Sequence, residues 1–307
     1  MRFCVFEASP GDRRLACATE ARAESVVDLT AAWSTPDAPR DVAELAARGD
    51  AGLAEARRIA TAADAPQLQV RGLKLLAPIP RPRRNVFCVG RNYREHIIEG
   101  NIAQGRDPHV FPEHIELFTK TTTTVTGPGA PIPLHAGLTR MLDYEAELAI
   151  VIGDGGKDID ESRGFDAVFG YTIVNDVSAR DLQRRHGQWF KGKSLDGTCP
   201  MGPWVVHKSA LGDPHSLAIR LWVNAELRQD GNTASMLFRI PTIVSLLSAG
   251  LTLEPGDVIA TGTPSGVGYA MKPPRPLQDG DMVAIEIDGL GRLENTVRAD
   301  SSTAQQK

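Results

Sequence analysis

The stretch Asp143-Tyr144-Glu145-Ala146-Glu147-Leu148-Ala149-Ile150-Val151-Ile152-Gly153 contains two carboxylates one residue apart, directly before an apolar run. Residues 148–152 are apolar and partly β-branched, and Gly153 ends the run, which predicts a buried strand. Because side chains alternate across a strand, Glu145 and Glu147 are predicted to share a face beside the hydrophobic core. Two like charges in such a place are costly unless a cation neutralises them.

A third carboxylate follows the next apolar run. Residues 168–174 predict another strand, which ends at Asn175-Asp176. Three carboxylates at the ends of two apolar strands, with no Cys or His beside them, suit a hard divalent cation such as Mg²⁺, Mn²⁺ or Ca²⁺. A Glu-x-Glu pair at a strand start is by itself more often a solvated edge. The third acid, and an unusual lysine that follows it, favour the metal site.

Length and composition describe an ordinary globular protein. The 307 residues suffice for one large domain, or for a large domain and a small one. The hydrophobic content of 42% and charged content of 23% are unremarkable for this class. A net charge of −4 without a basic stripe makes nucleic acid an unlikely partner.

Several absences from the sequence bear on location. The first residues become charged too early for a signal peptide, and no apolar run is long enough to cross a bilayer, so no membrane partner is expected. The four cysteines contain no CxxC pair and are expected to be reduced, mostly buried thiols in a cytoplasmic protein. They are Cys4, Cys17, Cys88 and Cys199.

The chain is predicted to fold in the α+β class and to be rich in β-structure. Residues 1–75 are predicted to form a small N-terminal α/β domain, 76–84 a proline-rich linker, 85–299 a larger domain that contains the acids, and 300–307 a flexible tail. The N-terminal part is predicted to contain strands at 2–8, 14–19 and 25–29 and helices at 41–47 and 51–60, with Asp41 and Asp50 as N-caps. The second part is predicted to contain strands at 86–89, 148–152, 168–174, 204–206, 218–223, 258–261 and 282–287, and helices at 94–99, 179–185 and 241–248.

The helix predicted at 94–99 carries a histidine and an acid on one face. His96 and Glu99 stand three residues apart, with Asn92 as a cap and Gly100 as a stop. A carboxylate that accepts the imidazole N–H makes the other ring nitrogen a better base for activating water. On this segment alone, an incidental surface ion pair is the more common interpretation.

Two later segments offer groups for an anion. Lys193, between Gly192 and Ser194, can hold a substrate carboxylate or enolate, although a solvated loop lysine is the commoner case. It follows a helix whose start fits a capping box, Ser178 with Asp181. The glycine-rich turn that contains Thr263 can direct N–H groups and a hydroxyl at an anion, or be an ordinary loop. No P-loop, dinucleotide fingerprint or GxSxG elbow is present.

Five ordered motifs between about 85 and 297 together resemble the fumarylacetoacetate hydrolase family. The motifs are Arg91-Asn92-Tyr93 with His96 and Glu99, Asp143-Tyr144-Glu145-Ala146-Glu147-Leu148, Asn175-Asp176-Val177-Ser178-Ala179-Arg180-Asp181, Gly192-Lys193-Ser194 and Thr261-Gly262-Thr263-Pro264-Ser265-Gly266-Val267-Gly268. The resemblance implies a roll of mixed β-sheets, usually a homodimer, that binds Mg²⁺ or Mn²⁺.

The same resemblance assigns roles to residues. It implies that Glu145, Glu147 and Asp176 are the metal ligands and that His96 with Glu99 activates water on a lid. It also implies substrate contacts, with Lys193 at the bound oxyacid and Thr263 at its carboxylate. Further substrate contacts are expected from Arg91, Tyr93 and Gly262.

The predicted reaction is hydrolysis of a carbon–carbon bond in a 2,4-dioxo acid of the acylpyruvate type, through an enolate held by the metal. Decarboxylation of oxaloacetate, or tautomerisation or isomerisation of an unsaturated oxo-dicarboxylate, uses the same enolate and stays open. A non-catalytic metal-dependent oxyacid-binding protein would keep the three acids but would not need His96 and Glu99 together. A scaffold protein would need none of the five motifs.

Overall fold

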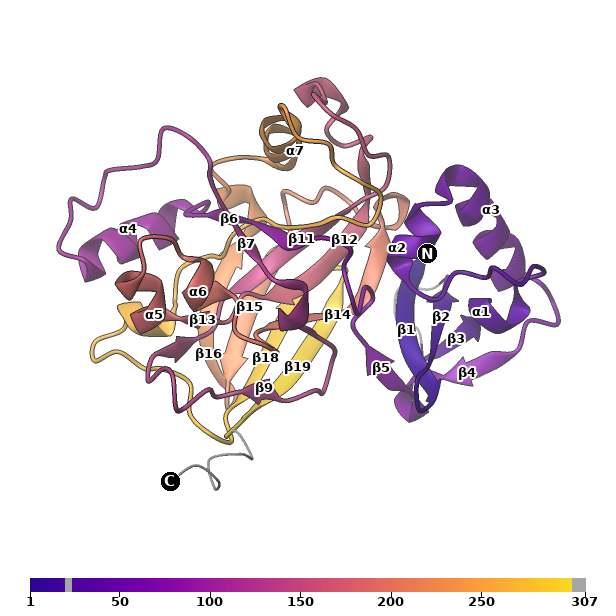
Figure 1. Ribbon diagram of the computed structural model, residues 1–307, viewed down its shortest axis with the longest axis horizontal. Coiled ribbons are helices and arrows are strands. Elements are labelled where there is room, and N and C mark those ends of the chain that lie inside the picture. Colours follow the sequence, from indigo (N-terminus) through magenta and orange to yellow (C-terminus); the bar gives the residue numbers. More distant parts are fainter. Residues whose placement is uncertain (20–23, 300–307) are drawn as a thin grey trace.

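The computed structural model describes residues 1–19 and 24–299, so the tail predicted at 300–307 lies outside the described residues. The fold is rich in strands, and its helices are mostly short, as the α+β prediction requires (Figure 1). A twelve-stranded sheet and a five-stranded sheet contain nearly all of the described strands. Among the described residues, no helix combines the length and the apolar character needed to cross a bilayer.

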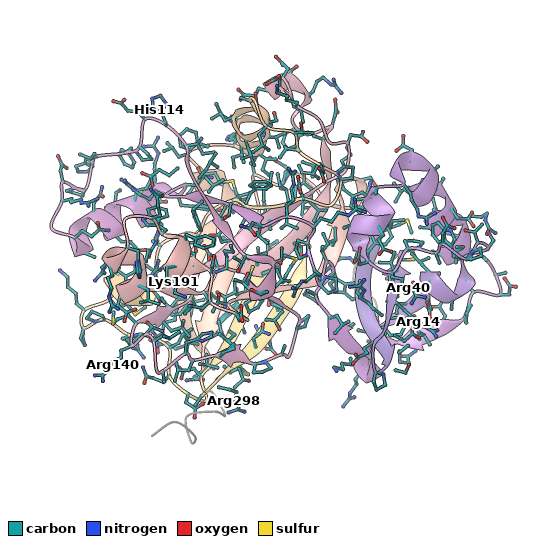
Figure 2. All side chains as sticks on the ribbon, viewed as in Figure 1. Arg14, Arg40, His114, Arg140, Lys191 and Arg298 are labelled. Carbon is teal, nitrogen blue, oxygen red and sulfur yellow. The ribbon has the colours of Figure 1, made fainter. Side chains whose placement is uncertain are left out.

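The N-terminal unit is a small sheet covered by helices, drawn in indigo and violet in Figure 1. Arg14 and Arg40 lie toward its surface and both contact Asp12 (Figure 2). Asp41 caps α2 as predicted, whereas Asp50 is no cap, because α3 begins at Gly49 after Arg48. The elements of this unit are β1 (Arg2–Ser9), β2 (Asp12–Ala18), β3 (Ser25–Asp28), α1 (Leu29–Ala32), α2 (Val42–Ala46), α3 (Gly49–Ala60), β4 (Gln67–Gln69) and β5 (Lys74–Leu76).

The rest of the chain continues the large sheet and adds the five-stranded one. The strands are β6 (Val86–Gly90), β7 (Glu116–Lys120), β8 (Val125–Thr126), β9 (Ile132–Pro133), β10 (Leu142–Asp143), β11 (Ala146–Ile152), β12 (Val168–Asn175), β13 (Ser178–Ala179), β14 (Cys199–His207), β15 (Ala218–Val223), β16 (Glu226–Asn232), β17 (Val258–Ala260), β18 (Met282–Ile287) and β19 (Gly291–Arg298). The α-helices are α4 (Arg94–Ala103), α5 (Arg180–Arg185), α6 (Phe190–Lys193) and α7 (Ile240–Ser248).

The large sheet runs from one unit into the other without a break. Its strand order is β4-β3-β2-β1-β14-β12-β11-β17-β6-β7, and β1 pairs with β14 through Arg2 opposite Val206 and Phe3 opposite Val205. In the proline-rich segment, Ala77 is buried and belongs to the same core. The division into domains at 76–84 therefore stays a prediction, since one sheet joins the two sides.

Strand β11 lies in the middle of the large sheet and is buried on both faces. Leu148 and Ile150 belong to the core between the two sheets, and Ala149 and Val151 belong to the core on the other side. An internal strand covered on both faces reads as a continuous apolar run rather than an alternating one. This explains the sequence 148–152 and places the acids at its start in a buried position.

Three further details of the predicted helices are wrong. Ser178 pairs in β13 and donates its hydroxyl to the Asp176 carbonyl, so it does not cap α5, which begins at Arg180. Asn92 does not cap α4, because its side chain binds the backbone of Phe238 and Thr261 instead. Helix α4 also continues through Gly100. Strand pairing at Ser178 and long-range backbone contacts at Asn92 replace the local capping interactions.

Candidate metal centre and active site

The three predicted ligands lie together and are buried. Glu145, Glu147 and Asp176 are 4%, 1% and 0% exposed, and each offers a carboxylate oxygen within 4.8 Å of the others. The pairing of β11 with β12 brings them together, because Ala146 lies opposite Asn175. The Asn175 side chain accepts a hydrogen bond from Glu145 N, and Asp176 N donates to the Glu145 carbonyl.

Two lysines hold Asp176 from opposite oxygens. Lys193 Nζ lies 2.7 Å from Glu145 Oε2 and 2.6 Å from Asp176 Oδ2, so it bridges two of the three acids. Lys120 Nζ lies 2.8 Å from Asp176 Oδ1 and donates to the Val177 carbonyl. Asp176 Oδ1 accepts no hydrogen bond from the described residues, and this ion pair is its charged contact there.

An arginine balances the other side of the cluster. Arg180 Nη1 lies 2.7 Å from Glu145 Oε1, and its Nε donates to Asp143. Burial acts to raise the pKa of the Glu145 carboxyl, but the charges of Lys193 and Arg180 outweigh it and hold this pKa well below its ordinary value. Glu145 is thus ionised and well paired.

Glu147 differs from its neighbours. Within the described residues it forms no ion pair, and its carboxylate accepts a single hydrogen bond, 2.8 Å from Gly262 N. Burial, and then the charges of Asp176 and Glu145, raise the pKa of Glu147 well above its ordinary value. This carboxylate lacks a cationic partner.

The charge balance of the cluster fits a divalent cation. Its four carboxylates, Asp143, Glu145, Glu147 and Asp176, face three cationic groups, Lys120, Arg180 and Lys193. The formal charge is therefore −1, and a divalent ion would make it +1, which favours an anionic ligand. The donor set consists of oxygen alone, which is what Mg²⁺ and Mn²⁺ prefer.

The predicted histidine–glutamate pair is formed on α4. His96 Nδ1 lies 2.9 Å from Glu99 Oε1, and the other Glu99 oxygen accepts a hydrogen bond of 2.9 Å from Gly266 N. A carboxylate at Nδ1 favours the proton there and leaves Nε2 able to accept one. The backbone contact at Gly266 fixes the acid, so the pair is more than an incidental surface contact.

A glycine lets α4 approach the site closely. A Cβ added at Gly100 would lie 2.8 Å from the hydroxyl of Tyr269. Tyr269 follows the glycine-rich turn whose Gly266 N–H binds Glu99, so the helix contacts this part of the chain at both residues.

One cavity of about 540 Å³ is lined by His96 and by two of the acids, Glu145 and Glu147, whereas Glu99 and Asp176 lie outside its lining. Its lining includes six of the predicted residues, namely Arg91, His96, Glu145, Glu147, Lys193 and Thr263. Tyr93 is fully buried in the core, and Gly262 directs its N–H at Glu147. Both residues lie behind the lining, so direct substrate contact by either one stays a prediction.

The sequence reasoning missed Lys120 and Gln229. Lys120 ends an otherwise partly apolar strand, and that position was the signal that could have identified it. Gln229 accepts from Ala146 N and donates to Thr263 Oγ1 at 2.9 Å. Because that oxygen already accepts a hydrogen bond, the Thr263 O–H remains available as a donor to an anion. No pattern around Gln229 in the sequence indicates this role.

The fold and the cavity together define a class of protein. In this class a roll of mixed β-sheets holds a cluster of buried carboxylates, and a short helix brings a histidine to the same cavity. The family model described as fumarylacetoacetate (FAA) hydrolase C-terminal matches residues 85–298. The chain belongs to this family, as the five motifs indicated.

Individual relatives are similar over nearly the whole chain. The oxaloacetate tautomerase YisK of Bacillus subtilis is 47% identical over 285 residues, covering 89% of this chain and 93% of that protein. The solved fumarylacetoacetate hydrolase of Exiguobacterium antarcticum is 43% identical, with a TM-score of 0.81, over 98% of this chain and 100% of its own. A maleylpyruvate hydrolase from Sphingobium sp. SYK-6, in complex with manganese(II) and pyruvate, is 30% identical, with a TM-score of 0.77 and the same coverage.

Proposed function

We propose that this chain is a Mg²⁺- or Mn²⁺-dependent enzyme that moves a proton between carbon and oxygen of a 2-oxo acid, as in the keto–enol interconversion of oxaloacetate. The observation that carries the proposal is that His96 lines the same cavity as Glu145 and Glu147. Its ring contacts Glu99, and the two acids lie beside Asp176. The similarity to a relative named as an oxaloacetate tautomerase supports it.

The residues divide the work between charge and proton transfer. A divalent ion held by Glu145, Glu147 and Asp176 would supply positive charge to the oxygens of the oxo acid. Lys193 and the Thr263 hydroxyl are placed to donate hydrogen bonds to an anion in the cavity. In the direction of enol formation, His96 Nε2 takes the proton from the carbon beside the carbonyl and gives it to the carbonyl oxygen, while Glu99 stabilises the charged imidazole. Ketonisation is the reverse transfer.

Hydrolysis of an acylpyruvate is the second candidate, and the same pair supports it. A base that can take a proton from carbon can take one from water, and relatives named as hydrolases have the same fold. In that reaction the distal carbonyl gains the hydroxyl, the carbon–carbon bond breaks, and the proton returns to the new methyl group.

One set of assays separates these activities. The protein, with MgCl2 or MnCl2, is mixed with oxaloacetate, and the enol absorbance is followed together with pyruvate and CO2. With oxaloacetate, tautomerisation changes the enol absorbance without releasing pyruvate or CO2, whereas decarboxylation releases both. With acetylpyruvate as the substrate, hydrolysis releases acetate and pyruvate. No metal-dependent turnover in any assay, together with no binding of oxalate to the metal-loaded protein, would contradict the proposal.

The predicted homodimer also stays a proposal, and light scattering on the purified protein measures it directly.

A further inference from the structure

We propose that Arg184 and Arg106 bind a second carboxylate of the substrate, so that the enzyme selects short 2-oxo dicarboxylic acids over 2-oxo monocarboxylic acids. The inference rests on the proposed function, because it assumes that the first carboxylate lies beside the acid cluster.

The cationic side chains of the cavity fall into two groups. Lys193 and Arg180 each contact Glu145, so their charges are balanced within the cluster. Of the remaining arginines in the lining, Arg91 forms an ion pair of 3.1 Å with Glu116. The positive charges of Lys193, Arg180 and Arg91 are therefore all compensated by acids before a metal binds.

Arg106 and Arg184 are different. Both line the cavity, both are exposed, and neither forms an ion pair with a residue in the described part of the chain. Two guanidinium groups that line one cavity and have no acidic partner in the described part of the chain create a positive potential that attracts an anion. A planar guanidinium also matches a carboxylate in two parallel hydrogen bonds.

Arg184 is connected to the acid cluster through an aromatic ring. It stands one turn after Arg180 on α5, and the two guanidinium groups lie against the same ring, 4.4 Å from the Tyr269 centroid for Arg180 and 5.5 Å for Arg184. Stacking on an aromatic ring restricts a long side chain before any ligand arrives. Less conformational entropy is then lost when an anion binds.

The ring itself is anchored to the cluster. Tyr269 N donates to Asp143, and the same carboxylate accepts from Arg180 Nε. Arg180 in turn contacts Glu145 at 2.7 Å. Arg184 is thus connected through one ring and one arginine to the acids that are predicted to hold the metal.

Racemic malate and racemic lactate provide the test, because they share a 2-hydroxy acid head and only malate has a second carboxylate. Calorimetry on the Mn²⁺-loaded protein should show malate binding roughly ten- to a hundredfold more tightly than lactate. In the Arg106→Gln/Arg184→Gln double variant this ratio should fall to near one. Arg185→Gln is the matched control, since Arg185 is exposed on the same helix but does not line the cavity.

Oxalate distinguishes the failure of this inference from failure of the proposed function. It has no distal group, so wild type and the double variant should bind it equally when loaded with Mn²⁺. Equal affinities of wild type for malate and lactate, or an unchanged ratio in the double variant, would overturn the distal carboxylate site. Wild type that does not bind oxalate would instead contradict the proposed function. Steady-state kinetics add a second readout: KM for oxaloacetate should rise in the double variant, with kcat little changed.

Discussion

The ion pairs of the N-terminal unit and those of the acid cluster are made from the same residue types, yet they lie in opposite environments. Arg58, paired with Glu55, has a side chain that is 63% exposed. Lys193 and Asp176, paired at 2.6 Å, have side chains that are 2% and 0% exposed. An exposed ion pair changes the free energy of unfolding little. Burying charges carries a large desolvation cost, which is offset only when every charge has an opposite partner. Glu147 is the exception in the cluster because it has no cationic partner among the described residues, and it is there that we expect a divalent cation to contribute most.

Replacing the histidine of the cavity should have the largest effect. His96→Gln should lower the turnover of oxaloacetate or acetylpyruvate by about a hundred- to ten-thousandfold, because the positioned base is lost. Its affinity for Mn²⁺ should stay that of wild type, since His96 is not among the predicted ligands. Stopped-flow absorbance and calorimetry measure the two quantities. Full activity of this variant would remove His96 from the mechanism.

Removing a buried cation should destabilise the protein far more than removing an exposed one. Lys120→Met leaves Asp176 with one lysine fewer in a fully buried place and should lower the free energy of unfolding by about 3–5 kcal/mol. Urea denaturation of the metal-free protein measures it. Because Mn²⁺ would replace the lost positive charge, adding it should restore part of the stability. An unchanged midpoint would mean that Lys120 and Asp176 do not stabilise one another.

The raised pKa of Glu147 gives the cluster a characteristic dependence on pH. A carboxyl with a higher pKa in the folded state than in the unfolded state favours folding at low pH. That contribution is lost as pH rises from the ordinary value of 4.5 through the folded pKa. The metal-free protein should therefore lose up to about 1.4 kcal/mol of stability per pH unit in this range. With Mn²⁺ present the trend should reverse, because the ion binds the ionised form.

Glu147→Gln is the control for this pH dependence, and denaturation series with and without Mn²⁺ compare it with wild type. The variant should show a flatter profile without metal and weak binding of Mn²⁺. A wild-type profile in the variant would assign the pH dependence to another group.

The smallest effect is expected at the surface. Arg58→Met breaks the exposed pair with Glu55 and should change the free energy of unfolding by about 0–1 kcal/mol, with activity unaffected. The same urea titrations measure it. A loss comparable to that of Lys120→Met would remove the distinction between the two regions.

The sequence was most informative where local pattern and tertiary structure agree. The run 148–152 predicted a buried strand, and β11 spans Ala146–Ile152. The two-residue spacing of Glu145 and Glu147, and the end of the next strand at Asp176, predicted a cluster that the structure forms. The spacing of His96 and Glu99 likewise predicted their contact.

Long-range contacts could not be predicted in this way. Lys120, Gln229 and Tyr269 reach the site from β7, β16 and the turn after the glycine-rich segment, far from the acids along the chain. Their side chains carry no local periodicity that marks them. Ser178 shows that a local signal can also mislead. Its sequence context predicts a helix cap, but the residue pairs in a strand and its hydroxyl donates to the Asp176 carbonyl.

The pairing of β1 with β14 has a consequence for any attempt to isolate the part of the chain that the family model matches. Cutting the chain before residue 85 would remove β1, and β14 would then present unpaired N–H and C=O groups along the stretch that faces Arg2 and Phe3. Open strand edges pair readily with other chains, which leads to aggregation. The N-terminal unit thus covers this edge of β14. We expect the shortened protein to aggregate more readily than the full chain.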